Sequence, residues 1–276
     1  MVPFLIGLAE SAVTIGALFV LGAFKWIESS KDDSCLDDHP GQLCYCENAR
    51  PGAMIKQRSN TWSNLGAVLV GLVLLAGLPK VVAGAGRDPM EERTFYAVLY
   101  GCVVIFVGTG SMYFHASMKK WGGWIDNLSM LLYTGFLLVY DFTGIVNGGK
   151  ALFLIVYLVL VAGLGVLSWF VPNSPIPHFS TGAFCFGAMA VLWVLLQFFA
   201  ILGIGGIDRD NGPALLLFIA GLIVFGVAFL IQQRSDTNKP WCQPDDVVQG
   251  HAIWHLLTAA VTVILFFYLR TEIGAR

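Results

Sequence analysis

The chain has 276 residues, of which 57% are hydrophobic and only 12% are charged, with a formal net charge of −2 and a mean hydropathy of +0.72. Soluble domains carry about 25% charged residues, so this composition excludes an ordinary soluble protein and indicates an integral membrane protein. The near-neutral charge and the lack of a basic run argue against nucleic acid as a partner.

Apolar runs of about 20 residues recur along the chain, and each is long enough to cross the hydrocarbon core of a membrane as a helix. Helices are favoured there because they satisfy their own backbone hydrogen bonds. The sequence therefore predicts an all-α, multi-pass bundle of seven transmembrane helices. The predicted spans are residues 61–80, 95–117, 121–142, 151–171, 180–203, 213–232 and 249–270.

A further apolar run, residues 3–27, precedes these spans and contains Glu10. A signal peptide is the alternative, but the run lacks a basic start and a small-residue cleavage pattern, so we expect an extra N-terminal helix. The expected organisation is an N-terminal helix over 1–27, a polar insert containing Cys and Asp over 28–60, and a seven-helix membrane domain over 61–276.

Three of the five histidines lie inside apolar, helix-length stretches. His251 and His255 are four residues apart and therefore share one helix face. His115 lies four residues after Ser111 on another span. Ionisable groups at membrane depth are costly and commonly mark a functional site. We therefore expect the three histidines to bind one metal ion.

Topology predicts that these residues meet. Counting crossings from the face that carries the 28–60 insert places the turns near residues 118, 175 and 240 on that same face, called here side A. Five candidate residues then lie within about two helical turns of side A, since a turn rises about 5.4 Å. They are Ser111, His115, Asp126, His251 and His255.

Three neutral imidazoles with water as the fourth ligand are typical of catalytic zinc, which lowers the pKa of that water. Asp126 could orient the water and accept its proton, and Ser111 could stabilise a developing oxyanion. The histidines could instead hydrogen-bond neighbouring helices or relay protons. Asp126 could equally be an interfacial residue, because Lys119, Lys120, Trp121 and Trp124 precede it.

Several segments together resemble the alkaline ceramidase family, seven-helix membrane hydrolases in a superfamily that includes adiponectin receptor-like proteins. They are GSMYFH from Gly110, Asp126, GHAIWHLLT from Gly250, TyrCysGlu at 45–47 and AsnThrTrpSerAsn at 60–64. The resemblance covers about residues 44–270. It implies that His115, His251 and His255 bind zinc, that Asp126 activates water and that Ser111 stabilises the transition state. The implied substrate is a membrane lipid, ceramide or a related N-acyl lipid, cleaved to a fatty acid and a long-chain base.

The sequence departs from the family in the acidic motif that binds calcium before the first helix. Cys44, Ala49 and Gln57 stand where the family has Asp, Asn and Glu, which leaves Glu47 as the candidate calcium ligand. Calcium prefers six to eight oxygen ligands, several of them carboxylates, so these departures argue against calcium regulation. The acidic run at 32–38 is expected to be a solvated surface.

Four cysteines map to side A and are disulfide candidates: Cys35, Cys44, Cys46 and Cys242. Disulfides there would place side A in an oxidising space such as the periplasm, the exterior or a lumen. Free thiols, or a structural metal held with His39, remain alternatives. Cys102 and Cys185 lie within spans and are expected to be small core residues.

Two other functions remain open. A receptor-like or transporter-like protein could hold the zinc structurally, but a structural site is normally closed by a fourth protein ligand, whereas this chain offers three intramembrane histidines. A hydrolase with the same chemistry could cleave a different lipid amide or an ester, because the same catalytic residues serve either carbonyl.

Overall fold

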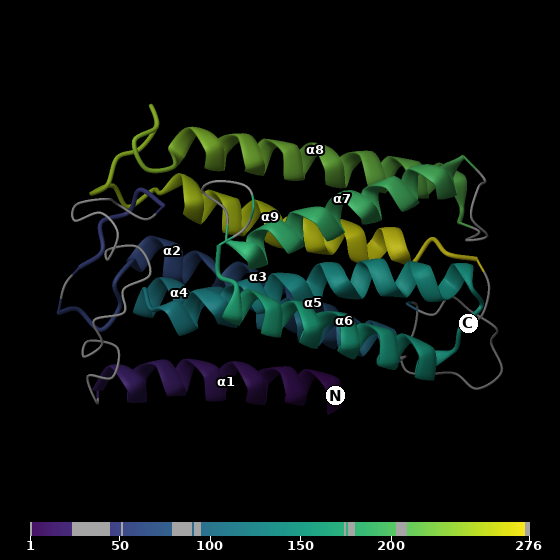
Figure 1. Cartoon of the computed structure of the whole chain (residues 1–276), viewed down its shortest axis with the longest axis horizontal. Helices are drawn as coiled ribbons and strands as arrows, with labels where there is room; N and C mark the ends of the chain where they lie inside the picture. Colours follow the sequence, from purple (N-terminus) through teal and green to yellow (C-terminus); the bar gives the residue numbers. More distant parts are fainter. Residues whose placement is uncertain are drawn as a thin grey trace.

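The computed structural model describes residues 2–23, 45–50, 52–78, 90, 95–173, 175, 180–202 and 209–273. Within these ranges the chain forms a bundle of long, roughly aligned helices (Figure 1). Seven of them are long and apolar enough to cross a membrane. The predicted all-α membrane bundle is therefore confirmed.

The helix bounds follow the predicted spans closely. The first span, Arg58–Gly77, is built from two helices that meet at Asn64. The helices in chain order are α1 Val2–Ala23, α2 Arg58–Ser63, α3 Leu65–Gly77, α4 Phe95–Ser117, α5 Lys120–Ile145, α6 Lys150–Phe170, α7 Thr181–Ile201, α8 Asn211–Ser235 and α9 Gly250–Leu269.

The N-terminal apolar run forms the helix α1, which packs on α3 and α4. Its contact face repeats every four residues, because Pro3, Gly7 and Ser11 are buried while Leu5 and Val13 are exposed. Gly7 permits the close approach, since a Cβ atom there would lie 2.7 Å from Ile105 Cδ1. Most of the polar insert, including Cys35, His39 and Cys44, lies outside the described residues.

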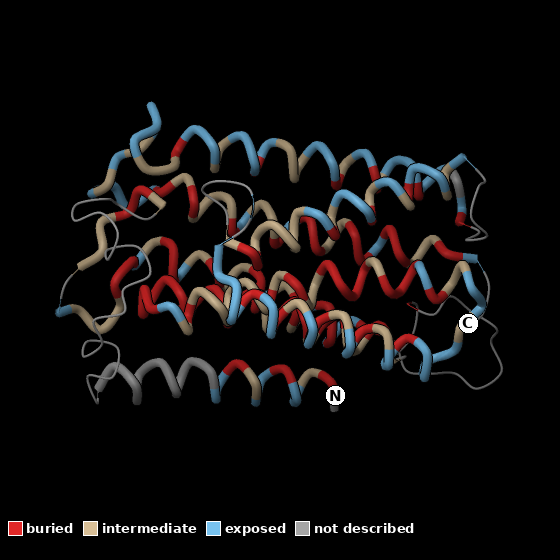
Figure 2. The backbone as a smooth tube through the Cα atoms, in the orientation of Figure 1, coloured by how far each residue is buried: buried red, intermediate tan, exposed pale blue. Residues whose placement is uncertain are grey.

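Burial is concentrated in α4, α5 and α9, whereas the outer face of α8 is exposed along its length (Figure 2). Large exposed side chains such as Val159, Phe170 and Leu216 are the ones expected to face lipid.

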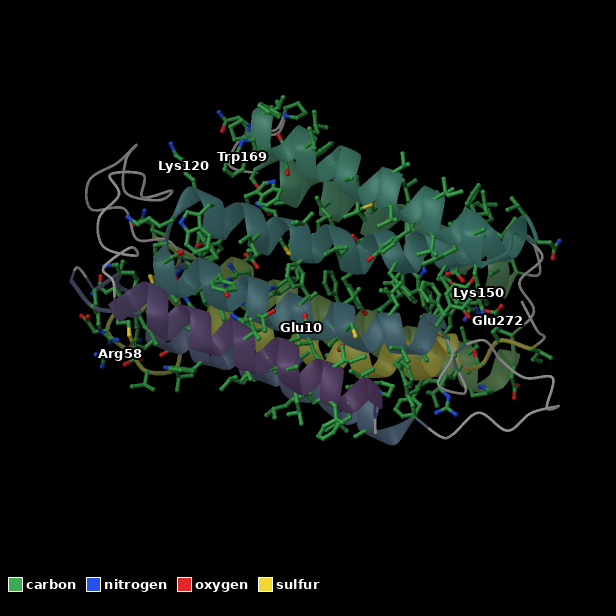
Figure 3. All side chains as sticks on the ribbon, turned by 90° about the horizontal axis from the view of Figure 1, so that it is seen from below. Glu10, Arg58, Lys120, Lys150, Trp169 and Glu272 are labelled. Atoms are coloured by element: carbon green, nitrogen blue, oxygen red, sulfur yellow. A yellow bond between two sulfur atoms is a disulfide. The ribbon has the colours of Figure 1, made fainter. Side chains whose placement is uncertain are left out.

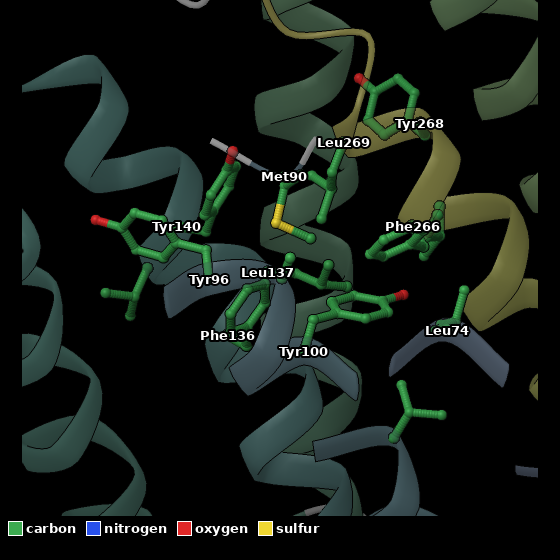
Figure 4. Packing of buried hydrophobic residues seen from close by; sticks show 14 of the residues in the cluster. Leu74, Met90, Tyr96, Tyr100, Phe136, Leu137, Tyr140, Phe266, Tyr268 and Leu269 are labelled. Atoms are coloured by element: carbon green, nitrogen blue, oxygen red, sulfur yellow. The ribbon is translucent and has the colours of Figure 1, made fainter. Parts of the chain in front are cut away.

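A buried hydrophobic cluster rich in aromatic side chains packs between the helices (Figure 4). Phe136 on α5 packs against Tyr100 on α4 and Phe153 on α6, with ring centroids 5.5 and 5.6 Å apart. Tyr100 also donates a 2.6 Å hydrogen bond to the Thr262 carbonyl oxygen, which ties α4 to α9. This packing fixes the positions of the helices that carry the candidate site.

The end of the bundle opposite the candidate site holds a buried ion pair. Arg209 Nη2 lies 2.6 Å from Asp141 Oδ1, and the guanidinium also stacks on the Tyr268 ring. The other carboxylate oxygen of Asp141 accepts hydrogen bonds from Trp193 and Gln197 on α7, both at 2.7 Å. Asp141 thus joins α5, α7 and the segment before α8, a role that the sequence did not reveal.

We predict that Asp141→Ala lowers the free energy of unfolding by about 3–5 kcal/mol, because the guanidinium, the indole and the amide lose their common carboxylate. Thermal unfolding in detergent micelles measures the effect. The control is Asp210→Ala, which changes an exposed acid next to Arg209 and should cost no more than about 0.5 kcal/mol. Equal stability of the two variants would contradict the role of the ion pair.

Candidate metal centre and active site

Three histidines converge at one end of the bundle. His115 lies near the end of α4, and His251 and His255 lie in the first two turns of α9. All three are buried, and their candidate ligand nitrogens lie within 4.8 Å of one another. This is the end marked by Arg58 and Lys120 in Figure 3, opposite Lys150 and Glu272. The sequence predicted this meeting from helix spacing and topology.

One nitrogen pair within the cluster already has the spacing expected at a tetrahedral metal ion. Nε2 of His251 lies 3.2 Å from Nε2 of His115. Two nitrogens that bind zinc tetrahedrally at 2.0–2.1 Å lie about 3.3 Å apart. Among the residues that the structure describes, no fourth His, Cys, Asp or Glu joins the group. The residues present therefore fit a three-histidine centre with an open position.

Each imidazole turns its Nδ1 atom outward to a polar side chain. For His115 this partner is Gln57 Oε1 at 2.7 Å, and for His251 it is Gln232 Oε1 at 2.6 Å. Nδ1 of His255 lies 2.8 Å from Ser63 Oγ and 3.1 Å from Asn64 Nδ2. Metal-binding histidines commonly carry such partners, which orient the ring.

Ser111 and Asp126 lie beside the cluster. Ser111 Oγ is 3.5 Å from His255 Nε2, and the hydroxyl is also hydrogen-bonded to the Asp126 carboxylate. Ser111 is buried one helical turn before His115, whereas Asp126 is only partly buried near the start of α5. The serine therefore touches both a candidate metal ligand and a candidate base.

Tyr45 covers the cluster from the segment before α2. Its ring stacks on His251 with centroids 4.1 Å apart and meets His115 edge-on at 5.4 Å. Desolvation, and then the nearby carboxylates of Asp126 and Asp236, raise the pKa of the Tyr45 phenol above its ordinary value. The phenol therefore keeps its proton at neutral pH and can act as a hydrogen-bond donor.

The backbone at Tyr45 is held in an unfavourable conformation. Tyr45 and Cys46 have φ values of 55° and 68°, in the left-handed region that bulky side chains rarely adopt. Such strain persists only where the surroundings enforce it. Here Cys46 is bonded to Cys242 in the connection between α8 and α9, which fastens the segment across the site.

Glu47 has a structural role in the same segment. Its two carboxylate oxygens accept hydrogen bonds from the backbone N–H groups of Ser59 and Asn60, each at 2.9 Å. The buried carboxylate thus satisfies donors at the start of α2, where a negative charge is favoured. These contacts give Glu47 a role in holding the start of α2.

The structure brings together the three histidines, Ser111 and Asp126, which the sequence singled out, and adds side chains that the sequence did not reveal as their partners. In the sequence, Gln57 stands out only as a departure from the calcium motif of the family, and no pattern marks Gln232. Segments 45–47 and 60–64 resemble the alkaline ceramidase family. This resemblance is the one feature of the sequence that points to Tyr45, Ser63 and Asn64. Of the disulfide candidates, Cys46 and Cys242 are bonded, and Cys35 and Cys44 lie outside the described residues. Cys102 and Cys185, which were expected to be small core residues, are free.

The sequence also matches a known protein family. The family model described as Ceramidase matches residues 44–273, which is most of the chain. The chain belongs to the ceramidase family. No curated protein matches the sequence significantly. Membership of the ceramidase family implies a hydrolase that acts on an amide bond, with a lipid such as ceramide as substrate. The helix α1 lies outside the matched region.

We predict that His251→Ala and His255→Ala each abolish stoichiometric metal binding, because two imidazoles cannot replace the three-nitrogen centre. Elemental analysis of the purified proteins measures zinc per chain. Thr258→Ala serves as the control, since it changes a described residue of the same helix that is not part of the cluster, and it should retain the metal. Full zinc content in both α9 variants would refute the assignment of these ligands.

The disulfide gives a separate prediction. Non-reducing peptide mapping of protein kept away from reductant should recover Cys46 linked to Cys242, because the structure bonds them directly. Cys102 and Cys185 should be alkylated as free thiols after unfolding, and they provide an internal control. Alkylation of Cys46 and Cys242 to the same extent would contradict the linkage.

Proposed function

We propose that this chain is a zinc-dependent amide hydrolase that works within the membrane near side A. Its substrate would be ceramide or a related N-acyl sphingoid lipid, cleaved to a fatty acid and a long-chain base. The observation that carries the proposal is the convergence of three buried histidine nitrogens beside Ser111 and Asp126 in a member of the ceramidase family.

The ligand set favours catalysis over a structural role. Structural zinc sites are closed by four protein ligands, whereas catalytic sites use three and leave a position for water or substrate. The three-histidine cluster matches the second pattern within the described part of the chain. This difference supports a hydrolase over a receptor-like protein with a structural metal.

Zinc held by His115, His251 and His255 would supply Lewis acidity to a water molecule and to the scissile carbonyl. Asp126 is partly buried and adjoins the cluster through Ser111, so it is placed to take the proton from that water. The water oxygen then adds to the amide carbonyl carbon. The C–N bond breaks as the proton passes from Asp126 to the departing nitrogen.

Ser111 would serve the same step as a hydrogen-bond donor. Before reaction its hydroxyl bonds with the Asp126 carboxylate. Once Asp126 has accepted a proton, its carboxyl group is neutral and a weaker acceptor for the Ser111 hydroxyl. The hydroxyl can then donate a hydrogen bond to the developing oxyanion. Tyr45 would exclude water from the opposite side of the histidine cluster, because its ring covers His251.

The position of the site suits a lipid substrate. The histidines lie within about two turns of the helix ends on side A, or roughly 10 Å in depth. An amide near the polar end of a membrane lipid reaches such a depth while its acyl chains remain in hydrocarbon. The Cys46–Cys242 disulfide supports an oxidising compartment on this side.

We predict that Asp126→Asn retains zinc and lowers hydrolysis by about 10²–10⁴-fold, because an amide cannot accept the proton of the water. Release of fatty acid and long-chain base from purified protein, assayed with ceramides, other N-acyl lipids and ester lipids, measures the loss. Asp246→Asn, at an exposed position between α8 and α9, is the matched control and should keep full activity.

Three outcomes would contradict parts of the proposal. Unchanged turnover in Asp126→Asn would remove this residue from the mechanism. Cleavage of ester lipids without cleavage of amide lipids would mean that the chain is a different lipid hydrolase. Zinc binding without hydrolysis of any lipid would favour the receptor-like alternative.

A further inference from the structure

The Nδ1 atoms of the three histidines are hydrogen-bonded to uncharged side chains. Gln57 faces His115, Gln232 faces His251, and Ser63 with Asn64 faces His255. The two glutamines come from different parts of the chain, since Gln57 immediately precedes α2 and Gln232 lies near the end of α8. Their amides therefore approach two different imidazoles independently.

The orientation of the Gln57 amide is fixed by its own hydrogen bonds. Gln57 Nε2 donates to the Glu47 carbonyl oxygen at 2.8 Å, and Gln57 Oε1 accepts from Asn60 Nδ2 at 3.2 Å. A flipped amide would lose both bonds, because it would place oxygen against oxygen and nitrogen against nitrogen. The oxygen atom of Gln57 must therefore face His115, 2.7 Å from Nδ1.

An amide oxygen can only accept, so the proton of neutral His115 must sit on Nδ1. Its Nε2 atom then carries a lone pair. Gln232 turns its Oε1 atom to Nδ1 of His251 at 2.6 Å, and this contact places the proton of His251 on Nδ1 and the lone pair on Nε2. These two Nε2 atoms lie 3.2 Å apart, so both lone pairs are available to one cation between them.

We propose that Gln57 and Gln232 are the positioning residues of the metal centre, and that they hold His115 and His251 in the tautomer and orientation that bind metal. The inference rests on the proposed zinc site and extends it to two residues outside the ligand set. Gln57 is completely buried and held by Glu47 and Asn60, whereas Gln232 is partly exposed on α8.

The test is zinc affinity, measured by competition with a chromophoric chelator on purified full-length protein. Gln57→Leu and Gln232→Leu keep much of the side-chain volume and remove the acceptor. Each should weaken zinc binding by about 10–100-fold, the usual effect of losing a group that orients a metal ligand. Gln232→Leu also keeps the test valid should Gln57→Leu fail to fold, because its position is partly exposed.

Two matched controls separate positioning from packing. Gln233→Leu changes the exposed neighbour of Gln232 on the same helix. Gln197→Leu changes a completely buried glutamine that bonds Asp141 at the opposite end of the bundle. Both controls should bind zinc as tightly as the unmodified chain, although Gln197→Leu should unfold at a lower temperature.

A spectroscopic measurement distinguishes positioning from a loss of folded protein. With cobalt in place of zinc, Gln57→Leu should change the shape and position of the ligand-field bands, because His115 is no longer held in place. A merely structural role would reduce the folded fraction and leave the band shape unchanged.

The zinc affinities test the positioning role of the glutamines separately from the proposed metal centre. Zinc binding by both leucine variants with the affinity of the unmodified chain would overturn the positioning role alone. Equal weakening in Gln233→Leu and Gln197→Leu would also overturn it, because the effect would then follow from general perturbation. Failure of the unmodified chain to bind zinc would instead overturn the metal centre on which the inference rests.

Discussion

The arrangement at side A depends on keeping three uncharged imidazoles turned toward one point in a buried environment. The Nε2 atoms of His115 and His251 lie 3.2 Å apart, and in the tautomers proposed above their lone pairs would repel each other unless a cation lay between them. Rotation of a ring or a change of tautomer would relieve that repulsion and destroy the site. The oxygen atoms of Gln57 and Gln232, which accept hydrogen bonds from His115 and His251, would oppose both changes. The proposed chemistry therefore depends on residues that bind no metal themselves.

The rest of the fold can be understood as support for this convergence. α5 carries Asp126 at the site and Asp141 at the opposite end, about 22 Å along the helix. At that far end Asp141 joins α7 to Arg209, and at the site end a disulfide fastens the segment before α2 to the α8–α9 connection. The bundle is therefore tied at both ends, and the aromatic cluster fixes the helices between them.

The sequence predicted the bundle and the metal cluster because both follow from periodic patterns. Apolar length located the spans, and the four-residue spacing puts His251 and His255 on one helix face wherever the helix begins and ends. The supporting residues leave no such pattern. A glutamine such as Gln57 looks the same at a surface as in a core, and the Asp141–Arg209 pair joins residues whose meeting depends on three-dimensional packing. Glu47 is a similar case. The sequence marks it as the candidate calcium ligand, and only the structure reveals that its carboxylate accepts two backbone hydrogen bonds.

The most direct test of a zinc-dependent amidase is reconstitution of metal-depleted protein. Purified chain is stripped with chelator and titrated with zinc while release of long-chain base from ceramide is followed. We expect hydrolysis to be absent without metal, to rise with added zinc and to saturate at one equivalent per chain. The reason is that the described residues form one three-histidine group. Full activity in the stripped protein, or no ceramide cleavage at any zinc level, would contradict it.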